Sequence, residues 1–192
     1  MTMFDVVLFL HVAVLLAAFF LGGALHAAEY QIGSARTVQD LKVVTRPFRF
    51  GAFFAPLVIL LFLLGMWLVE LSKDGDEVFH VKEPFAWTAI VAVVILLLDG
   101  ALVMGRHGAA LGKAIAAAPE GPVPPALGEL ATEPLTWMTS HMNTFMVLGV
   151  VLNMVTKPET LVAVIDVVGG AAIGLVLGSV MSRRARGALV AA

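Results

Sequence analysis

The sequence predicts an all-α membrane protein, a bundle of five transmembrane helices in a single domain over residues 1–192. The composition is 60% hydrophobic and 14% charged, whereas a soluble domain is about half apolar and about a quarter charged. The mean hydropathy of +0.97 points the same way. A transmembrane helix needs about 20 mostly apolar residues. Stretches of that kind occupy about residues 4–27, 51–71, 84–104, 135–155 and 161–181.

The first three apolar stretches have recognisable starts. No Lys or Arg precedes the first stretch and Asp5 lies at its start, so we interpret it as an uncleaved span and not as a secretory signal. Pro47 precedes the second stretch and Pro84 begins the third, and proline is tolerated in the first turn of a helix. An Ala-rich segment without proline predicts that the third helix continues to about Ala118.

The second half of the chain is expected to be a further hairpin. Residues 119–125, with the sequence PEGPVPP, cannot continue a helix because proline lacks the backbone donor and fixes φ. They predict a cytoplasmic linker. Residues 156–160 separate the last two stretches, and so short a connection predicts antiparallel neighbours.

The charges predict the orientation, since cytoplasmic loops are enriched in Lys and Arg. The loop after the second stretch contains mostly acids, Asp74, Asp76, Glu77 and Glu83. The basic residues cluster before the second stretch and after the third and fifth, at Arg36, Lys42, Arg46, Arg49, Arg106, Lys113, Arg183, Arg184 and Arg186. We therefore expect the N-terminus outside and the C-terminus in the cytoplasm.

Several classes of function are disfavoured by composition and motifs. The chain has no cysteine, which excludes disulfides, thiolate metal sites and cysteine nucleophiles. Twelve Lys and Arg against 14 Asp and Glu argue against a nucleic-acid surface. Nucleophile elbows, phosphate-binding glycine loops and HExxH motifs do not occur in the sequence. The expected partner is the lipid bilayer.

Polar groups inside a bilayer are costly and are candidate functional groups. The best candidates are His11, Asp99, His141 and Asp166. At about 1.5 Å of rise per residue, His11 and Asp166 are expected at similar depth on the outer side, and Asp99 and His141 on the inner side. Two carboxylate and histidine pairs would permit proton or cation transfer. Alternatively, each group bonds a neighbouring helix and only fixes the packing.

The fourth stretch carries Met138, Met142 and Met146 near His141. Imidazole and thioether groups are ligands for haem iron and for copper, so His11, His141, Met138 and Met142 are candidate ligands of one haem b or of copper. The alternative is that the methionines form an adaptable packing surface.

Small residues and tryptophans predict packing and anchoring. Gly170, Gly174 and Gly178 repeat at a spacing of four, which lets another helix approach closely. We expect this face to mediate an oligomer or larger complex, or to bury the fifth helix against the first. Trp67, Trp87 and Trp137 are expected to be interfacial anchors.

Three short motifs resemble the DUF2269 family of bacterial integral membrane proteins, which is similar in outline to the CopD-like group. They are Leu10, His11 and Val12 with Leu21, Gly22 and Gly23; Gly65; and Met154, Val155, Thr156, Lys157 and Pro158. The resemblance extends to Pro158 and implies a bacterial inner-membrane protein without an established activity. It also implies copper handling or haem binding, with His11 as the ligand.

Three hypotheses about function follow. The first is a non-enzymatic inner-membrane protein, an accessory or transport-related bundle whose polar residues form internal contacts. The second is a redox or metal-handling protein with haem b or copper. The third is a small proton-coupled carrier that uses Asp99 and Asp166.

Overall fold

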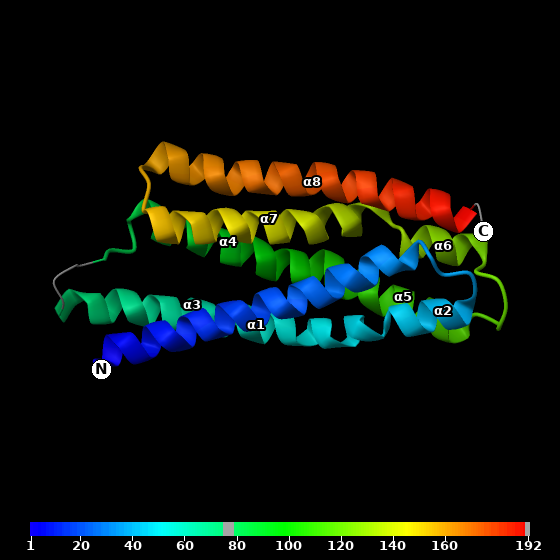
Figure 1. Cartoon of the computed structure of the whole chain (residues 1–192), viewed down its shortest axis with the longest axis horizontal. Helices are drawn as coiled ribbons and strands as arrows, with labels where there is room; N and C mark the ends of the chain where they lie inside the picture. The colour runs from blue at the N-terminus through cyan, green and yellow to red at the C-terminus, as the bar shows by residue number, and fades with distance from the viewer. Residues whose placement is uncertain (75–78, 191–192) are drawn as a thin grey trace.

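The computed structural model describes residues 1–74 and 79–190, and these are helical with short connections. Asp76 and Glu77, on which part of the predicted orientation rests, lie outside the described residues. Five helical units are long and apolar enough to cross a membrane, as predicted. The chain passes back and forth along the long axis, so the two termini lie at opposite ends (Figure 1). The elements are α1 (Met3–Ile32), α2 (Val38–Val44), η1 (Arg46–Phe53), α3 (Phe54–Leu71), η2 (Ser72–Asp74), α4 (Pro84–Asp99), η3 (Gly100–Met104), α5 (Gly105–Ala117), α6 (Pro125–Ala131), α7 (Pro134–Thr156) and α8 (Thr160–Val190).

Two groups of helices form the bundle. Helices α1 and α3 pack against each other, and α4 packs against both α7 and α8. In Figure 1, α8 and α7 lie at the top of the bundle and α1 and α3 at the bottom, with α4 between them. Contacts between the two groups are sparser, which leaves room for an internal cavity.

The most extensive contact joins α7 to α8. Three glycines of α8 face α7 so closely that an added Cβ would overlap its backbone. Gly170 lies against Phe145, and Gly174 lies against His141. The glycine face is therefore occupied within the chain, and both predicted uses for it, a partner subunit and α1, were wrong. Small residues permit this close approach, which favours dispersion contacts in lipid.

Several helices continue beyond the predicted spans. Helix α8 has 31 residues and is about 45 Å long at 1.5 Å per residue, whereas the apolar core of a bilayer is about 30 Å thick. The predicted fifth span ended near Met181, where arginines begin, but the helix runs to Val190 because no proline interrupts it. Helix α5 extends the third span to Ala117, close to the predicted Ala118.

The extended ends pack together into a compact unit that we call the cap. Its buried core comes from α1, α2, α5, α6, α7 and α8 and comprises Ile32, Ala35, Val38, Leu41, Leu111, Ile115, Leu127, Ala131, Trp137 and Ala185. Trp137 is only 2% exposed and donates its Nε1–H to the carbonyl of Ala131 at 3.2 Å. It was predicted to be an interfacial anchor, and it is instead part of the core of the cap.

The proline-rich linker is tied to the cap by backbone hydrogen bonds. Val38 N–H donates to the Gly121 carbonyl at 2.9 Å, and Val123 N–H donates to the Arg36 carbonyl at 3.3 Å. Gly121 has a φ of 129°, a conformation that side chains disfavour. The linker therefore holds α5 and α6 beside the start of α2.

Candidate functional site

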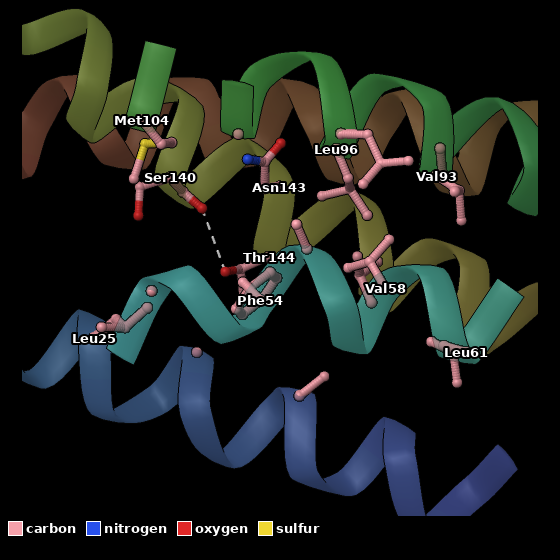
Figure 2. Close-up of a pocket in the computed structure, with 18 of the residues that line it drawn as sticks. Leu25, Phe54, Val58, Leu61, Val93, Leu96, Met104, Ser140, Asn143 and Thr144 are labelled. Carbon is pink, nitrogen blue, oxygen red and sulfur yellow. Dashed lines mark hydrogen bonds between the residues drawn. The ribbon is translucent and has the colours of Figure 1, made fainter. Parts of the chain in front are cut away.

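A cavity of about 790 Å³ lies between the two groups of helices. Residues of α1, η1, α3, α4, η3, α5, α6 and α7 line it. Its walls are mostly apolar. Figure 2 shows Val58 and Leu61 of α3 across the cavity from Val93 and Leu96 of α4. Ligand pockets in proteins measure about 300–1,000 Å³ and are mainly apolar with a few polar groups, so this cavity has the dimensions of a small-molecule site.

Helix α7 contributes a polar strip to the wall of the cavity, formed by Ser140, Asn143 and Thr144 (Figure 2). Asn143 Nδ2 donates to Asp99 Oδ2 at 2.6 Å. Its Oδ1 is buried and has no hydrogen-bond partner among the described residues. Buried polar atoms are nearly always paired, so this oxygen is a free acceptor for a ligand that donates a hydrogen bond.

Asp99 occupies a special position in its helix. It is the last residue of α4 and directly precedes η3, which is a turn of π-helix. Inserted π turns occur frequently at functional sites. Gly105 N–H donates to the Gly100 carbonyl in this turn. The insertion sits beside the polar strip of α7, because η3 contacts α7.

His26 and Glu29 lie one turn apart on α1 and line the cavity near the cap. His26 Nδ1 is 2.8 Å from Glu29 Oε2, and His26 Nε2 is 2.7 Å from Thr144 Oγ1. A carboxylate only accepts hydrogen bonds, so His26 Nδ1–H donates to Glu29. Both residues are largely buried, with side chains 16% and 6% exposed. His26 therefore links α1 to α7 through two polar contacts.

The ring of His141 on α7 packs against the ring of His26 on α1, and the two ring centroids are 4.7 Å apart. Its Nδ1 is 2.9 Å from the carbonyl oxygen of Trp137. A carbonyl only accepts, so Nδ1 carries the proton, and a neutral ring then has a lone pair on Nε2. The hydroxyl of Tyr30 is 3.1 Å from this Nε2. Trp137 also stacks on the His141 ring, with an interplanar angle of 11°.

Neither predicted carboxylate and histidine pair forms. Asp99 bonds Asn143, whereas His141 contacts Tyr30 and Trp137. Residues 141 and 143 are two positions apart on α7, which at 3.6 residues per turn points them in nearly opposite directions. The depth of each residue along its helix, which the sequence gives, does not show whether residue 141 or residue 143 faces Asp99.

The second predicted pair is also not assembled. His11 lies on α1 facing α3, where a Cβ on Gly65 would come within 3.2 Å of His11 Cε1. Glycine at position 65 therefore makes room for the imidazole ring. His11 lines the cavity, and its buried Nδ1 has no hydrogen-bond partner among the described residues. The backbone carbonyl of Asp166 packs against Gly149 of α7, so Asp166 belongs to a different interface.

The expected haem or copper ligands do not converge. His11 is about 22 Å along α1 from His26 at 1.5 Å per residue, and His26 adjoins His141. Met138 and Met142 pack with their backbones against Gly178 and Gly174 of α8 and do not line the cavity. Two imidazoles on opposite sides of one haem iron need ring centres about 6 Å apart, given metal–nitrogen bonds of about 2.0 Å. The His26 and His141 rings are closer than that.

The sequence prediction missed His26 and Glu29 as site residues. His26 was not among the candidate residues, and Glu29 fell just beyond the predicted end of the first span. The signal was His26, Glu29 and Tyr30 at i, i+3 and i+4, positions that share one face of a helix. Three titratable or phenolic groups on one face of an apolar helix would have indicated a polar site.

No family model, curated protein or solved structure matches this chain. The resemblance to the DUF2269 family therefore stays a prediction, and the argument for function rests on the geometry of the site.

Proposed function

We propose that this multi-pass membrane protein binds a small amphipathic molecule in its internal cavity and serves an accessory or transport-related role. The apolar body of the molecule would lie between α3 and α4, and its polar group would face the strip on α7. This proposal retains the first hypothesis drawn from the sequence and adds a defined binding site.

The volume of the cavity is the observation that carries the proposal. The space of about 790 Å³ is lined mainly by apolar side chains, and water gains little from entering an apolar space. The favourable occupant is therefore an apolar or amphipathic molecule.

The polar strip supports a ligand with a hydrogen-bonding group. Asn143 Oδ1 has no hydrogen-bond partner in the described part of the chain, whereas Thr144 Oγ1 is already held by His26 Nε2 at 2.7 Å. A hydroxyl, amine or amide of a ligand would satisfy the free acceptor. Such a group would also fix the orientation of the ligand, since few polar groups give apolar pockets their specificity.

The distribution of charge supports the orientation predicted from the sequence. Nine of the 12 Lys and Arg residues lie in α2, η1, α5 and α8 or in the connection before α2, at the end of the bundle that holds the cap. Cytoplasmic segments are the ones enriched in these residues. We therefore infer that the cap faces the cytoplasm and the N-terminus faces outward, in the bacterial inner membrane that the resemblance implies.

A pair of adjacent substitutions tests the binding site. Val93 lines the cavity, whereas its neighbour Val94 is 51% exposed on the outside of the bundle. Val93→Trp would fill the cavity, and Val94→Trp would add the same side chain facing lipid. We expect native mass spectrometry of the purified wild type and of Val94→Trp to detect one retained small molecule, and Val93→Trp to lack it.

Two outcomes contradict the proposal. One is that wild type and both variants carry only bulk phospholipid in the proportions of the host membrane, which would reduce the cavity to lipid-filled space. The other is equal retention of the small molecule by Val93→Trp. Circular dichroism and gel filtration of both variants establish that they remain folded, so loss of ligand is not confused with loss of structure.

The same preparation tests the two narrower hypotheses. A Soret band in the optical spectrum would establish haem binding, despite the arrangement of His26 and His141. Proton-driven uptake in liposomes that depends on both Asp99 and Asp166 would establish a proton-coupled carrier.

A further inference from the structure

We propose that His26, Glu29 and His141 form a binding site for one divalent first-row transition-metal ion. The site lies where α1 and α7 meet, at the end of the cavity next to the cap. This inference does not depend on which molecule fills the apolar part of the cavity.

The distances suit a metal with little rearrangement. One ligand atom from each of the three residues lies within 4.8 Å of the other two. Bonds of about 2.0–2.1 Å to imidazole or carboxylate place the ligands of a tetrahedral ion about 3.4 Å apart. His26 Nδ1 and Glu29 Oε2 are already 2.8 Å apart, and the most distant ligand atoms would have to approach by up to about 1.4 Å. Side-chain rotation on two rigid helices provides a movement of that size.

His141 is already oriented as a metal ligand. Histidines that bind metals usually donate the other ring N–H to a backbone carbonyl or carboxylate, which fixes the tautomer. The contact of Nδ1 with the Trp137 carbonyl does this and directs the lone pair to Nε2. Trp137 is held in turn by its own hydrogen bond to Ala131 and by burial. The orientation of the ring therefore depends on the core of the cap.

Glu29 supplies the negative charge that the ion requires. It is 5% exposed, and a charge is rarely found in such a place without a compensating partner. Its described side-chain contact is with His26 at 2.8 Å. A divalent ion bound beside Glu29 would compensate the carboxylate fully, whereas a neutral His26 offers it one hydrogen bond. Two imidazoles and one carboxylate leave a net charge of +1 at the site.

The ligand set selects the class of metal. The chain has no cysteine, so soft thiolate coordination is absent. Imidazole and carboxylate groups suit Zn²⁺, Fe²⁺ and Co²⁺, whereas Mg²⁺ and Ca²⁺ prefer all-oxygen sites. The Tyr30 hydroxyl lies beside His141 Nε2, and the Thr144 hydroxyl lies beside His26 Nε2. Tyr30 is 52% exposed, so the site lies close to the surface of the bundle on that side.

Co²⁺ and Zn²⁺ are suitable probes for the full-length protein in detergent. The protein is first stripped with a chelator, then loaded with either metal and dialysed. We expect one metal per chain by elemental analysis, and a strong visible Co²⁺ spectrum typical of a protein site with few ligands. Glu29→Gln and His141→Gln should weaken binding by roughly 100-fold or more, since even the loss of a residue that only hydrogen-bonds a metal ligand weakens it about 10–100-fold.

His11→Gln is the matched control. His11 lies on the same helix, lines the same cavity and is similarly buried, at 8% exposed, but it is far from the three ligands. We expect this variant to bind metal as the wild type does. Equal loss of metal in His11→Gln and His141→Gln, or no stoichiometric metal in the wild type, would overturn the proposal. Circular dichroism shows whether each variant is folded, and Glu29→Gln, which keeps nearly the same shape, provides an independent test if His141→Gln is not.

Discussion

Replacement of Gly174 by alanine should separate α7 from α8. A Cβ at this position would lie 2.6 Å from the Cα of Met142 and 2.6 Å from the carbonyl carbon of His141. Carbon atoms pack best at about 3.5–4.0 Å, so the helices must move apart by about 1 Å. Because both neighbours are backbone atoms, no side-chain rotation relieves the overlap.

The expected destabilisation follows from this overlap. Overpacking of a well-packed interface costs about 1–3 kcal/mol. Alanine favours a helix over glycine by about 0.8–1.0 kcal/mol, which offsets part of that cost. Gly169→Ala provides the matched control, since a Cβ there meets nothing within 4 Å. The difference between the two variants cancels the helix propensity and leaves the overpacking cost, so we expect it to be about 1–3 kcal/mol.

Reversible unfolding in mixed micelles, followed by circular dichroism, measures both free energies of unfolding. Gly174→Ala should be less stable than the wild type, and Gly169→Ala equally stable or slightly more stable. Equal stability of the two alanine variants would refute the packing of α7 on α8 along this glycine face.

Three further results are expected. Removal of the contact between Asp99 and Asn143 should show a coupling energy of about 0.6–2 kcal/mol in a double-mutant cycle; zero coupling would contradict the hydrogen bond. Trp137→Phe should lower the free energy of unfolding by about 1 kcal/mol, because the carbonyl that accepts from Nε1 loses its partner; an unchanged midpoint of unfolding would contradict the buried cap. In this cysteine-free chain, an impermeant maleimide applied to intact cells should label Lys82→Cys but label Ser34→Cys only after permeabilisation; the reverse pattern would invert the proposed orientation.

Hydropathy was sufficient to predict the five membrane-spanning helices, because a membrane imposes a minimum length of apolar sequence. Local chemistry also predicted the break at the proline-rich linker. The ends of the helices were less predictable. Arg183 and Arg184 appeared to end the last span, but charged residues do not stop a helix once it leaves the bilayer, and α8 continues to Val190.

Hydropathy could not predict which helices contact one another. A helix that is apolar all round gives no indication of which face is buried, so nothing identified α7 as the partner of Gly170 and Gly174. The same limit hid the contact of His26 with His141, because residues 115 positions apart are brought together only by packing. Asp99, in contrast, was recognised as an interior polar residue, although its partner proved to be Asn143.

A crystal structure of the full chain grown from a lipidic mesophase would show directly whether the cavity is filled. We predict ligand density between α3 and α4, beside Val58 and Val93, with a polar group within hydrogen-bond distance of Asn143 Oδ1. A map in which α1 and α3 rest directly on α4 and α7, with no volume between them, would contradict the proposed binding function.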